Sequence, residues 1–203
     1  MKVSQNWLKS LVEINTTPDD LSERLSIGGF EVESLIDCAE NIKGVILGKV
    51  VSVIKHENSD KLSICSVDIG RSNTLQIICG AKNVTPNIHV YVATIGAHLS
   101  AIDLTIKRTE IRGVMSEGMI CSLEELGIED NSEGIAIINK EIALKHQLGT
   151  PVALLLDLND YIYDLAITAN RPDGMSVIGI AREISALLES KLNFPEIIKK
   201  YQI

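Results

Sequence analysis

The feature that most constrains this fold is a change in the spacing of apolar residues near residue 43. From there to about residue 140, apolar and polar residues alternate in short segments, namely GVILGKVVSVIKH, KLSICSVDI, TLQIICGA, HVYVATIGA and GIAII. These segments are rich in β-branched residues and are separated by Gly, Asn, Asp and Pro, which is typical of antiparallel β structure. The middle of the chain therefore predicts a β domain of about five strands.

The predicted strands fit a small closed barrel better than an open sheet. Closure removes the exposed strand edges, and Gly48 permits a sharp bend in the first strand. This pattern favours a barrel of the oligonucleotide-binding-fold type, with a β-sandwich as the alternative.

Helical spacing flanks the β region on both sides. Ser4 is a candidate N-cap for SQNWLKSLVEI, in which Trp7, Leu8 and Leu11 share one face. After the strand-like LDLNDYIYDLAIT, a second helix places six apolar residues on one face: Val177, Ile180, Ala181, Ile184, Leu187 and Leu188. Neither flank alone has enough apolar surface for a core, so we expect the two to pack together.

The predicted fold class is therefore α+β. A small α/β domain is formed by both chain ends, residues 1–40 and 152–203, and a five-stranded oligonucleotide-binding-type barrel of residues 41–151 is inserted between them. A strand at FEVESLI leads out of the first flank.

The stretch TTPDDLSERLSIGG predicts the best-defined helix. Thr17 is its candidate N-cap, Pro18 occupies the first helical position, and Asp19 and Asp20 favour the positive end of the helix dipole. Gly28 is expected to end the helix in the left-handed region.

Composition excludes several classes of protein. A net charge of −8 argues against binding nucleic acid through a broad positive field. The four cysteines form no CxxC pair, which indicates free thiols and predicts no metal site. The apolar runs are too short to cross a bilayer, and the N-terminus lacks the apolar core of a signal peptide, so we expect a cytoplasmic protein without a membrane partner.

No catalytic motif is present. The chain has no G-x-S-x-G, no phosphate-binding glycine loop followed by Lys-Ser or Lys-Thr, and no H-E-x-x-H. We therefore predict no catalytic residue.

Cationic loops are the candidate binding features. HENSDKL is either a structured strand connection or a loop that uses Asn58 and Lys61 to contact a phosphate while Asp60 fixes its shape. The other candidates are Lys82 and Asn83 after the strand IICGA, and the cluster Lys107, Arg108 and Arg112. Stacking on bases is not expected, because Tyr91 is the only aromatic residue between residues 40 and 151. Any RNA contact should be weak and salt-sensitive.

Three stretches, HENSDKLSICSVDIG, IICGAKNV and IRGVMSEGMICSLEELGI, together resemble the tRNA-binding domain family. This resemblance implies that the third stretch closes a barrel. Gly113 and Gly118 would permit backbone turns, Ser116 would bond a local amide, Met119 would fill the interior, and Arg112 would contact phosphate.

The flanks resemble the N-terminal region of a second family, the bacterial phenylalanyl-tRNA synthetase beta subunits, in MKVSQNWLKSLVEI, LSIGGFEVES and TANRPDGMSVIGIAREISALL. In this resemblance Asn170, Arg171 and Asp173 connect a strand to a helix, with Asp173 as the helix cap. The family implies an alpha-subunit partner in a heterotetramer of two alpha and two beta chains, with ATP and magnesium used by the parent enzyme and no cofactor held by these residues.

The resemblance further implies that this chain alone is inactive, a scaffold and auxiliary tRNA-binding module of a ligase. The alternative is a free-standing dimeric tRNA-binding or assembly protein with the same barrel. The flanking helices and TANRPDG favour the first hypothesis, because a free-standing barrel needs neither.

Overall fold

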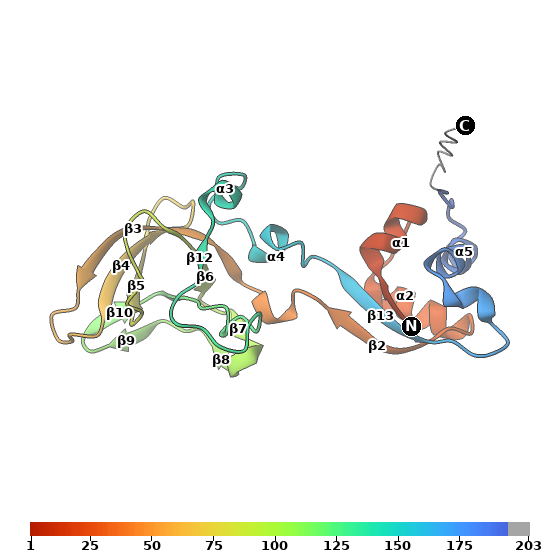
Figure 1. Cartoon of the computed structure of the whole chain (residues 1–203), viewed down its shortest axis with the longest axis horizontal. Helices are drawn as coiled ribbons and strands as arrows, with labels where there is room; N and C mark the ends of the chain where they lie inside the picture. Colours follow the sequence, from red (N-terminus) through yellow and green to blue (C-terminus); the bar gives the residue numbers. More distant parts are fainter. Residues whose placement is uncertain (195–203) are drawn as a thin grey trace, which may run out of the picture. The chain divides into compact units, whose positions relative to one another are not determined.

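The structure, a computed structural model, describes residues 1–194 and consists of two compact units (Figure 1). One unit combines residues 1–38 with residues from 160 onward, and the other comprises residues 39–159. The domain boundaries predicted from the sequence lie after residues 40 and 151. The short helix α4 (Val152–Leu155) and the turn after it therefore lie in the β-rich unit.

A three-stranded antiparallel sheet forms the centre of the α/β unit, in the order β1-β13-β2. These strands are β1 (Lys2–Ser4), β13 (Tyr161–Ala166) and β2 (Glu31–Asp37). Tyr163 in the middle strand pairs with Val3 on one side and Leu35 on the other, and it is fully buried. Its hydroxyl donates to the Pro18 carbonyl at 3.4 Å, so the buried phenol retains a polar partner.

Three helices accompany this sheet: α1 (Gln5–Leu11), α2 (Pro18–Ile27) and α5 (Val177–Leu187) (Figure 1). Ser4 accepts a hydrogen bond from the Trp7 amide, and Thr17 accepts one from the Asp20 amide, so both predicted N-caps are confirmed. Leu8 in α1 and Ile180 and Ile184 in α5 are fully buried in one apolar cluster. Trp7, predicted to share a face with Leu8, is instead 58% exposed, because neighbouring helical residues point about 100° apart.

The end of α2 differs from the prediction by one residue. Gly28 has the helical φ of −71°, and Gly29 has the left-handed φ of 91°. The Gly29 amide donates to Ser26 and the Phe30 amide to Leu25, which is the Schellman arrangement. This turn directs Phe30 into the core, where it is fully buried.

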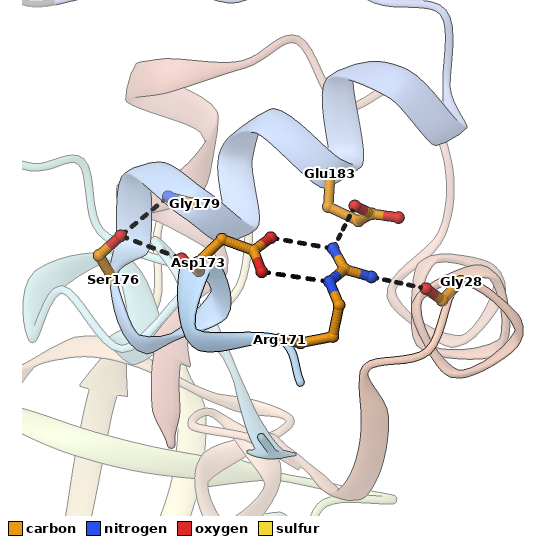
Figure 2. Close-up of polar contacts among 6 residues, drawn as sticks. All are labelled: Gly28, Arg171, Asp173, Ser176, Gly179 and Glu183. Atoms are coloured by element: carbon orange, nitrogen blue, oxygen red, sulfur yellow. Dashed lines mark hydrogen bonds and ion pairs between the residues drawn. The ribbon is translucent and has the colours of Figure 1, made fainter. Parts of the chain in front are cut away.

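Arg171 connects three segments of the α/β unit (Figure 2). Its Nε and Nη2 donate to the two carboxylate oxygens of Asp173 at 3.2 and 3.0 Å, and Nη2 also lies 2.7 Å from Glu183 of α5. Nη1 donates to the Gly28 carbonyl at 3.2 Å, and the guanidinium lies 4.1 Å above the centre of the Phe30 ring. Hydrogen bonds to Asp173 and then Glu183 raise the pKa of Arg171 above its usual value. The predicted strand-to-helix connection is therefore also a clamp on the end of α2.

The N-cap of α5 is Ser176, and the predicted cap Asp173 has a different role. Ser176 Oγ accepts from the Gly179 amide at 3.1 Å (Figure 2). Residues Pro172–Met175 form one 3₁₀ turn, η3, before the α-helix begins. This turn moves the helix start beyond Asp173, whose carboxylate is used by Arg171 instead.

The β-rich unit contains a nearly closed antiparallel barrel. The main path of its sheet runs β11-β6-β3-β4-β5, and β12 pairs with β6. The sheet has six strands: β3 (Val45–Lys55), β4 (Ser63–Asp68), β5 (Leu75–Cys79), β6 (His89–Thr94), β11 (Gly118–Ile120) and β12 (Ile137–Ile138). Short elements complete the unit: η1 (Glu40–Ile42), β7 (His98–Leu99), η2 (Ser100–Ile102), β8 (Leu104–Thr105), β9 (Thr109–Ile111), β10 (Val114–Ser116) and α3 (Lys140–Ala143).

Two separate features shape strand β3. The pairing with β4 shifts register between Val50 and Ser52, which marks a bulge. At Gly48, a Cβ would lie only 2.5 Å from Val92 and 3.0 Å from Val67, so glycine leaves the space that these interior valines fill. Gly48 therefore allows close packing inside the barrel, and the bend itself lies two residues later.

Candidate nucleic-acid interface

The tip of the β9–β10 hairpin is a two-residue turn made by Arg112 and Gly113. Their φ angles are 52° and 89°, and Ile111 pairs with Val114 across the turn. Two positive φ angles at adjacent residues are what a tight turn of the I′ type requires. The predicted turn at Gly113 thus also places Arg112 in the left-handed region.

The loop after β3 holds this hairpin tip. The buried His56 ring accepts from the Asn58 amide at Nδ1 (3.0 Å), which leaves Nε2 as the donor to the Ile111 carbonyl at 3.3 Å. Arg112 Nη1 donates to the Asn58 carbonyl at 3.1 Å, and Asn58 Nδ2 donates to the Arg112 carbonyl at 3.3 Å. Two RNA-binding candidates, Asn58 and Arg112, are therefore bonded to each other.

Asp60 and Lys61 occupy the next part of this loop. The Asp60 carboxylate pairs with Lys55 Nζ at 2.6 Å, which links the loop back to the end of β3. The Lys61 amide donates to Ser59 Oγ at 3.4 Å, and the Lys61 side chain is exposed.

Ser116 helps close the barrel between β5 and the segment before β11. Its Oγ accepts from the Ile78 amide at 3.1 Å and donates to the Gly118 carbonyl at 3.0 Å. The Glu117 amide donates to the Gln76 carbonyl at 2.8 Å beside it. The amide that Ser116 binds is 38 residues away in sequence, so this bond joins distant strands.

Two other residues of the closing stretch, Gly118 and Met119, belong to β11. A Cβ at Gly118 would lie 2.9 Å from the Ala93 carbonyl oxygen, so glycine permits the close pairing of β11 with β6. Met119 is half-buried and packs against an apolar cluster that contains Leu47 and Tyr91.

The remaining candidates differ in how their side chains are used. Asn83 Oδ1 accepts from the Ile135 amide at 3.1 Å, and its Nδ2 donates to the Ile135 carbonyl at 2.8 Å, so its amide clamps a second strand connection. Arg108 pairs with Glu117 at 3.1 Å. Lys82 and Lys107 are exposed and have no ion pair within the part of the chain that the structure describes.

A groove of about 790 Å³ lies beside these lysines. Lys107 lines it, as do Leu62 and Ala81, the immediate neighbours of Lys61 and Lys82. Ile78, Ser116 and Met119 form part of its wall. One exposed lysine, Lys107, therefore lines this groove, and the loops that carry Lys61 and Lys82 contribute their neighbouring residues to it.

Two glutamates also line the groove, and both bind backbone amides. Glu125 Oε2 accepts from the Ser122 amide at 2.7 Å while Ser122 Oγ accepts from the Glu125 amide at 3.1 Å, a reciprocal capping box. Glu124 Oε2 accepts from the Ser132 amide at 3.2 Å. These bonds were not part of the sequence prediction, although the spacing Ser122-x-x-Glu125 is a capping-box signature.

Among the described residues, the groove offers no aromatic side chain on which a base could stack. Tyr91, the one aromatic residue of this region, is 8% exposed and packs in a core cluster, so it presents no face to a base. Over residues 1–194, no group of three or more His, Cys, Asp or Glu side chains could hold a metal ion. The same residues include no helix that is both long and apolar enough to cross a bilayer.

Comparisons with known proteins identify the β-rich region. The family model described as "Putative tRNA binding domain" matches residues 45–147. Among solved structures, the "MetRS related protein from Pyrococcus horikoshii" is 18% identical with a TM-score of 0.37, covering 52% of this chain and 85% of that one. So distant a likeness adds nothing to the assignment.

Curated relatives match both flanks as well as the barrel. The chain is 81% identical over 202 residues to the phenylalanine–tRNA ligase beta subunit of Prochlorococcus marinus subsp. pastoris, covering all of this chain and 25% of the relative. The corresponding protein of Prochlorococcus marinus strain MIT 9312 is 77% identical over 203 residues, again with 25% of its length covered. The chain thus spans about a quarter of the length of these relatives. It belongs to the tRNA-binding domain family, and over its whole length it is similar to phenylalanine–tRNA ligase beta subunits.

Proposed function

We propose that this chain is the N-terminal part of the beta subunit of phenylalanine–tRNA ligase, which attaches phenylalanine to its tRNA. In this proposal a five-stranded oligonucleotide-binding-type barrel is inserted into an α/β domain made by both chain ends. The parent enzyme works in the cytoplasm with ATP and magnesium, and its alpha subunit is the partner in a heterotetramer of two alpha and two beta chains. Similarity across both flanks supports this proposal over a free-standing dimeric tRNA-binding protein.

The barrel serves as an auxiliary contact for the tRNA backbone. The observation that carries this proposal is Lys107 in the wall of the groove, with Lys61 and Lys82 on two loops that also line it; all three are exposed and without ion pairs in the described residues. Lysines on separate loops present point charges that can each neutralise one phosphate along an RNA strand. Asn58, Asn83, Arg108 and Arg112 hold these loops in place through their bonds to other parts of the barrel.

Binding of labelled tRNA should therefore be weak and strongly dependent on salt. If the three lysines each neutralise one phosphate, affinity should fall about 40-fold between 50 and 200 mM salt, using the duplex slope as a guide. Fluorescence anisotropy at the two salt concentrations measures this fall directly.

A triple variant, K61A/K82A/K107A, tests the groove itself. We expect it to bind tRNA more weakly at 50 mM salt and to reduce the slope of log affinity against log salt concentration by about three. The matched control, K2A/K9A/K191A, removes the same charge from exposed lysines of the α/β unit. Equal binding by the two triple variants, or no binding by the unmodified chain at 50 mM salt, would refute an RNA contact at this groove.

These 203 residues alone should catalyse neither aminoacylation nor hydrolysis of mischarged tRNA. Among the groove residues, the carboxylates of Glu124 and Glu125 are bonded to backbone amides, and Ser116 bonds backbone groups on both of its sides. Release of pyrophosphate from ATP with phenylalanine and tRNA, and deacylation of a phenylalanine tRNA that carries a wrong amino acid, are the two assays. Turnover in either assay by the purified chain contradicts this prediction.

A further inference from the structure

A second group of basic side chains lies at the beginning of β6. His89 pairs directly with Lys49 across the β3–β6 ladder, so their side chains lie on the same face of the sheet. Lys140 begins the short helix α3 and lines a pocket of about 710 Å³ together with His89. This pocket shares no lining residue with the groove described above. Three basic groups from three elements thus meet at a separate place on the barrel unit.

The His89 ring is unusual because it is buried among these charges without a protein partner. It is 9% exposed, and no hydrogen bond to either ring nitrogen occurs within residues 1–194. Burial first, and then the charges of Lys49 and Lys140, lower the pKa of His89. The ring is therefore held neutral in the free protein, with its polar atoms open to a ligand that supplies negative charge.

Two acidic residues lie near this cluster, and neither neutralises it. Asp68 is opposite Lys49 across the β3–β4 pair, but its Oδ1 accepts from the Gly70 amide at 2.8 Å. Glu141 lines the pocket, and its side chain is exposed. Neither carboxylate comes within ion-pair distance of Lys49 or Lys140 in the described part of the chain. Lys49 and Lys140 thus form no ion pair in the described part of the chain, and both ammonium groups stay available to an anion beside the His89 ring.

We propose that Lys49, His89 and Lys140 form a second phosphate-binding site, which takes a backbone phosphate of the same RNA. This inference rests on the proposed function of the barrel as a tRNA contact. A phosphate beside His89 would favour the imidazolium, so the ring would gain a proton as the RNA binds. The site would add salt dependence to binding, and it would also make binding depend on pH.

The direction of the pH effect follows from proton uptake. His89 has a lowered pKa in the free protein and a higher one in the complex, so binding is tightest at low pH. Affinity should then fall as the pH rises through the pKa of the complex. Between about pH 6 and pH 8 we expect tRNA binding to weaken several-fold in the unmodified chain. H89N should remove this change, whereas H98N, at an exposed histidine of the same unit, should keep it.

The lysines are tested by the slope of log affinity against log salt concentration. Loss of two phosphate contacts in K49A/K140A should reduce this slope by about two. The control K9A/K191A removes the same charge from exposed lysines outside the β-rich unit and should leave the slope unchanged. Equal slopes in the two double variants, or a pH effect that survives in H89N, would overturn the second site.

A readout without RNA separates this inference from the proposed function. Pyrophosphate should shift the NMR signals of the His89 ring in the unmodified chain at pH 7, and should not do so in K49A/K140A. If tRNA fails to bind while this shift occurs, the proposed function fails and the site is a pocket for small phosphates. If pyrophosphate causes no shift, the phosphate site is refuted whatever tRNA does. Displacement of bound tRNA by polyglutamate as readily as by unlabelled RNA would indicate a protein partner and overturn the assignment to RNA.

Discussion

Replacing Phe30 with alanine should lower the free energy of unfolding of the α/β unit by about 3–5 kcal/mol. The ring is fully buried in the cluster that also contains Leu25, Tyr163 and Ile180. Its cavity would not close easily, because the Arg171 guanidinium lies over one face of the ring and Gly174 lies at its edge. A Cβ at Gly174 would be 2.1 Å from Phe30 Cε1, which shows how closely backbone packs against this side chain.

The matched control is F194A, because Phe194 is 57% exposed and lies outside the apolar core clusters. Its replacement should change stability by no more than about 0.5–1 kcal/mol, including its contact with Arg182. Urea unfolding followed by the fluorescence of Trp7, the one tryptophan of the chain, reports on the α/β unit. A loss below about 1 kcal/mol in F30A would mean that the cluster repacks and that Phe30 does not hold it together.

The elements of the α/β unit were predictable because their signals are local. Thr17, Pro18 and the paired aspartates specify the start of α2 within four residues of sequence, and each acts through backbone groups next to it. The left-handed residue that ends α2 was predicted at Gly28 and lies at Gly29. Either glycine of this pair satisfies the pattern of a glycine after the last helical turn. Asp173 was misassigned as a cap for a similar reason: its partner Arg171 competes for the carboxylate, and Ser176 provides an equivalent cap three residues later.

The candidate interface was predictable as a set of loops, but the use of each side chain was not. Arg112 and Asn58 are 54 residues apart, and Asn83 binds the backbone 52 residues away at Ile135. These partners are carbonyl and amide groups that every residue carries, so the sequence contains no sign of the pairing. Lys61, Lys82 and Lys107 are exposed because no such partner lies near them. The distinction between a cation that holds a loop and one that faces solvent therefore requires the fold.

Replacing Gly70 with alanine should lower the free energy of unfolding of the β-rich unit by about 2–6 kcal/mol, from two independent costs. Gly70 has a φ of 75°, where a side chain costs about 1–3 kcal/mol of backbone strain. A Cβ there would also lie 2.3 Å from the Leu148 carbonyl oxygen, which belongs to backbone and is not free to turn away. Gly149, in the facing segment, is under the same constraint, because a Cβ added there would lie 2.6 Å from the Ile69 carbonyl oxygen. The two strand connections therefore run against each other with no room for a methyl group.

The control G96A separates the two costs. Gly96 has a φ of 93°, and a Cβ at this position would meet no heavy atom within 4 Å, so alanine there adds strain without a clash. We expect G96A to cost about 1–3 kcal/mol and G70A to cost about 1–3 kcal/mol more, both measured by urea unfolding. The difference between the two variants is the free energy of the contact between residues 69–70 and 148–149. Equal losses would mean that this contact opens without cost, and the close approach at Gly70 would then contribute nothing to holding the end of β4 against the segment that follows α3.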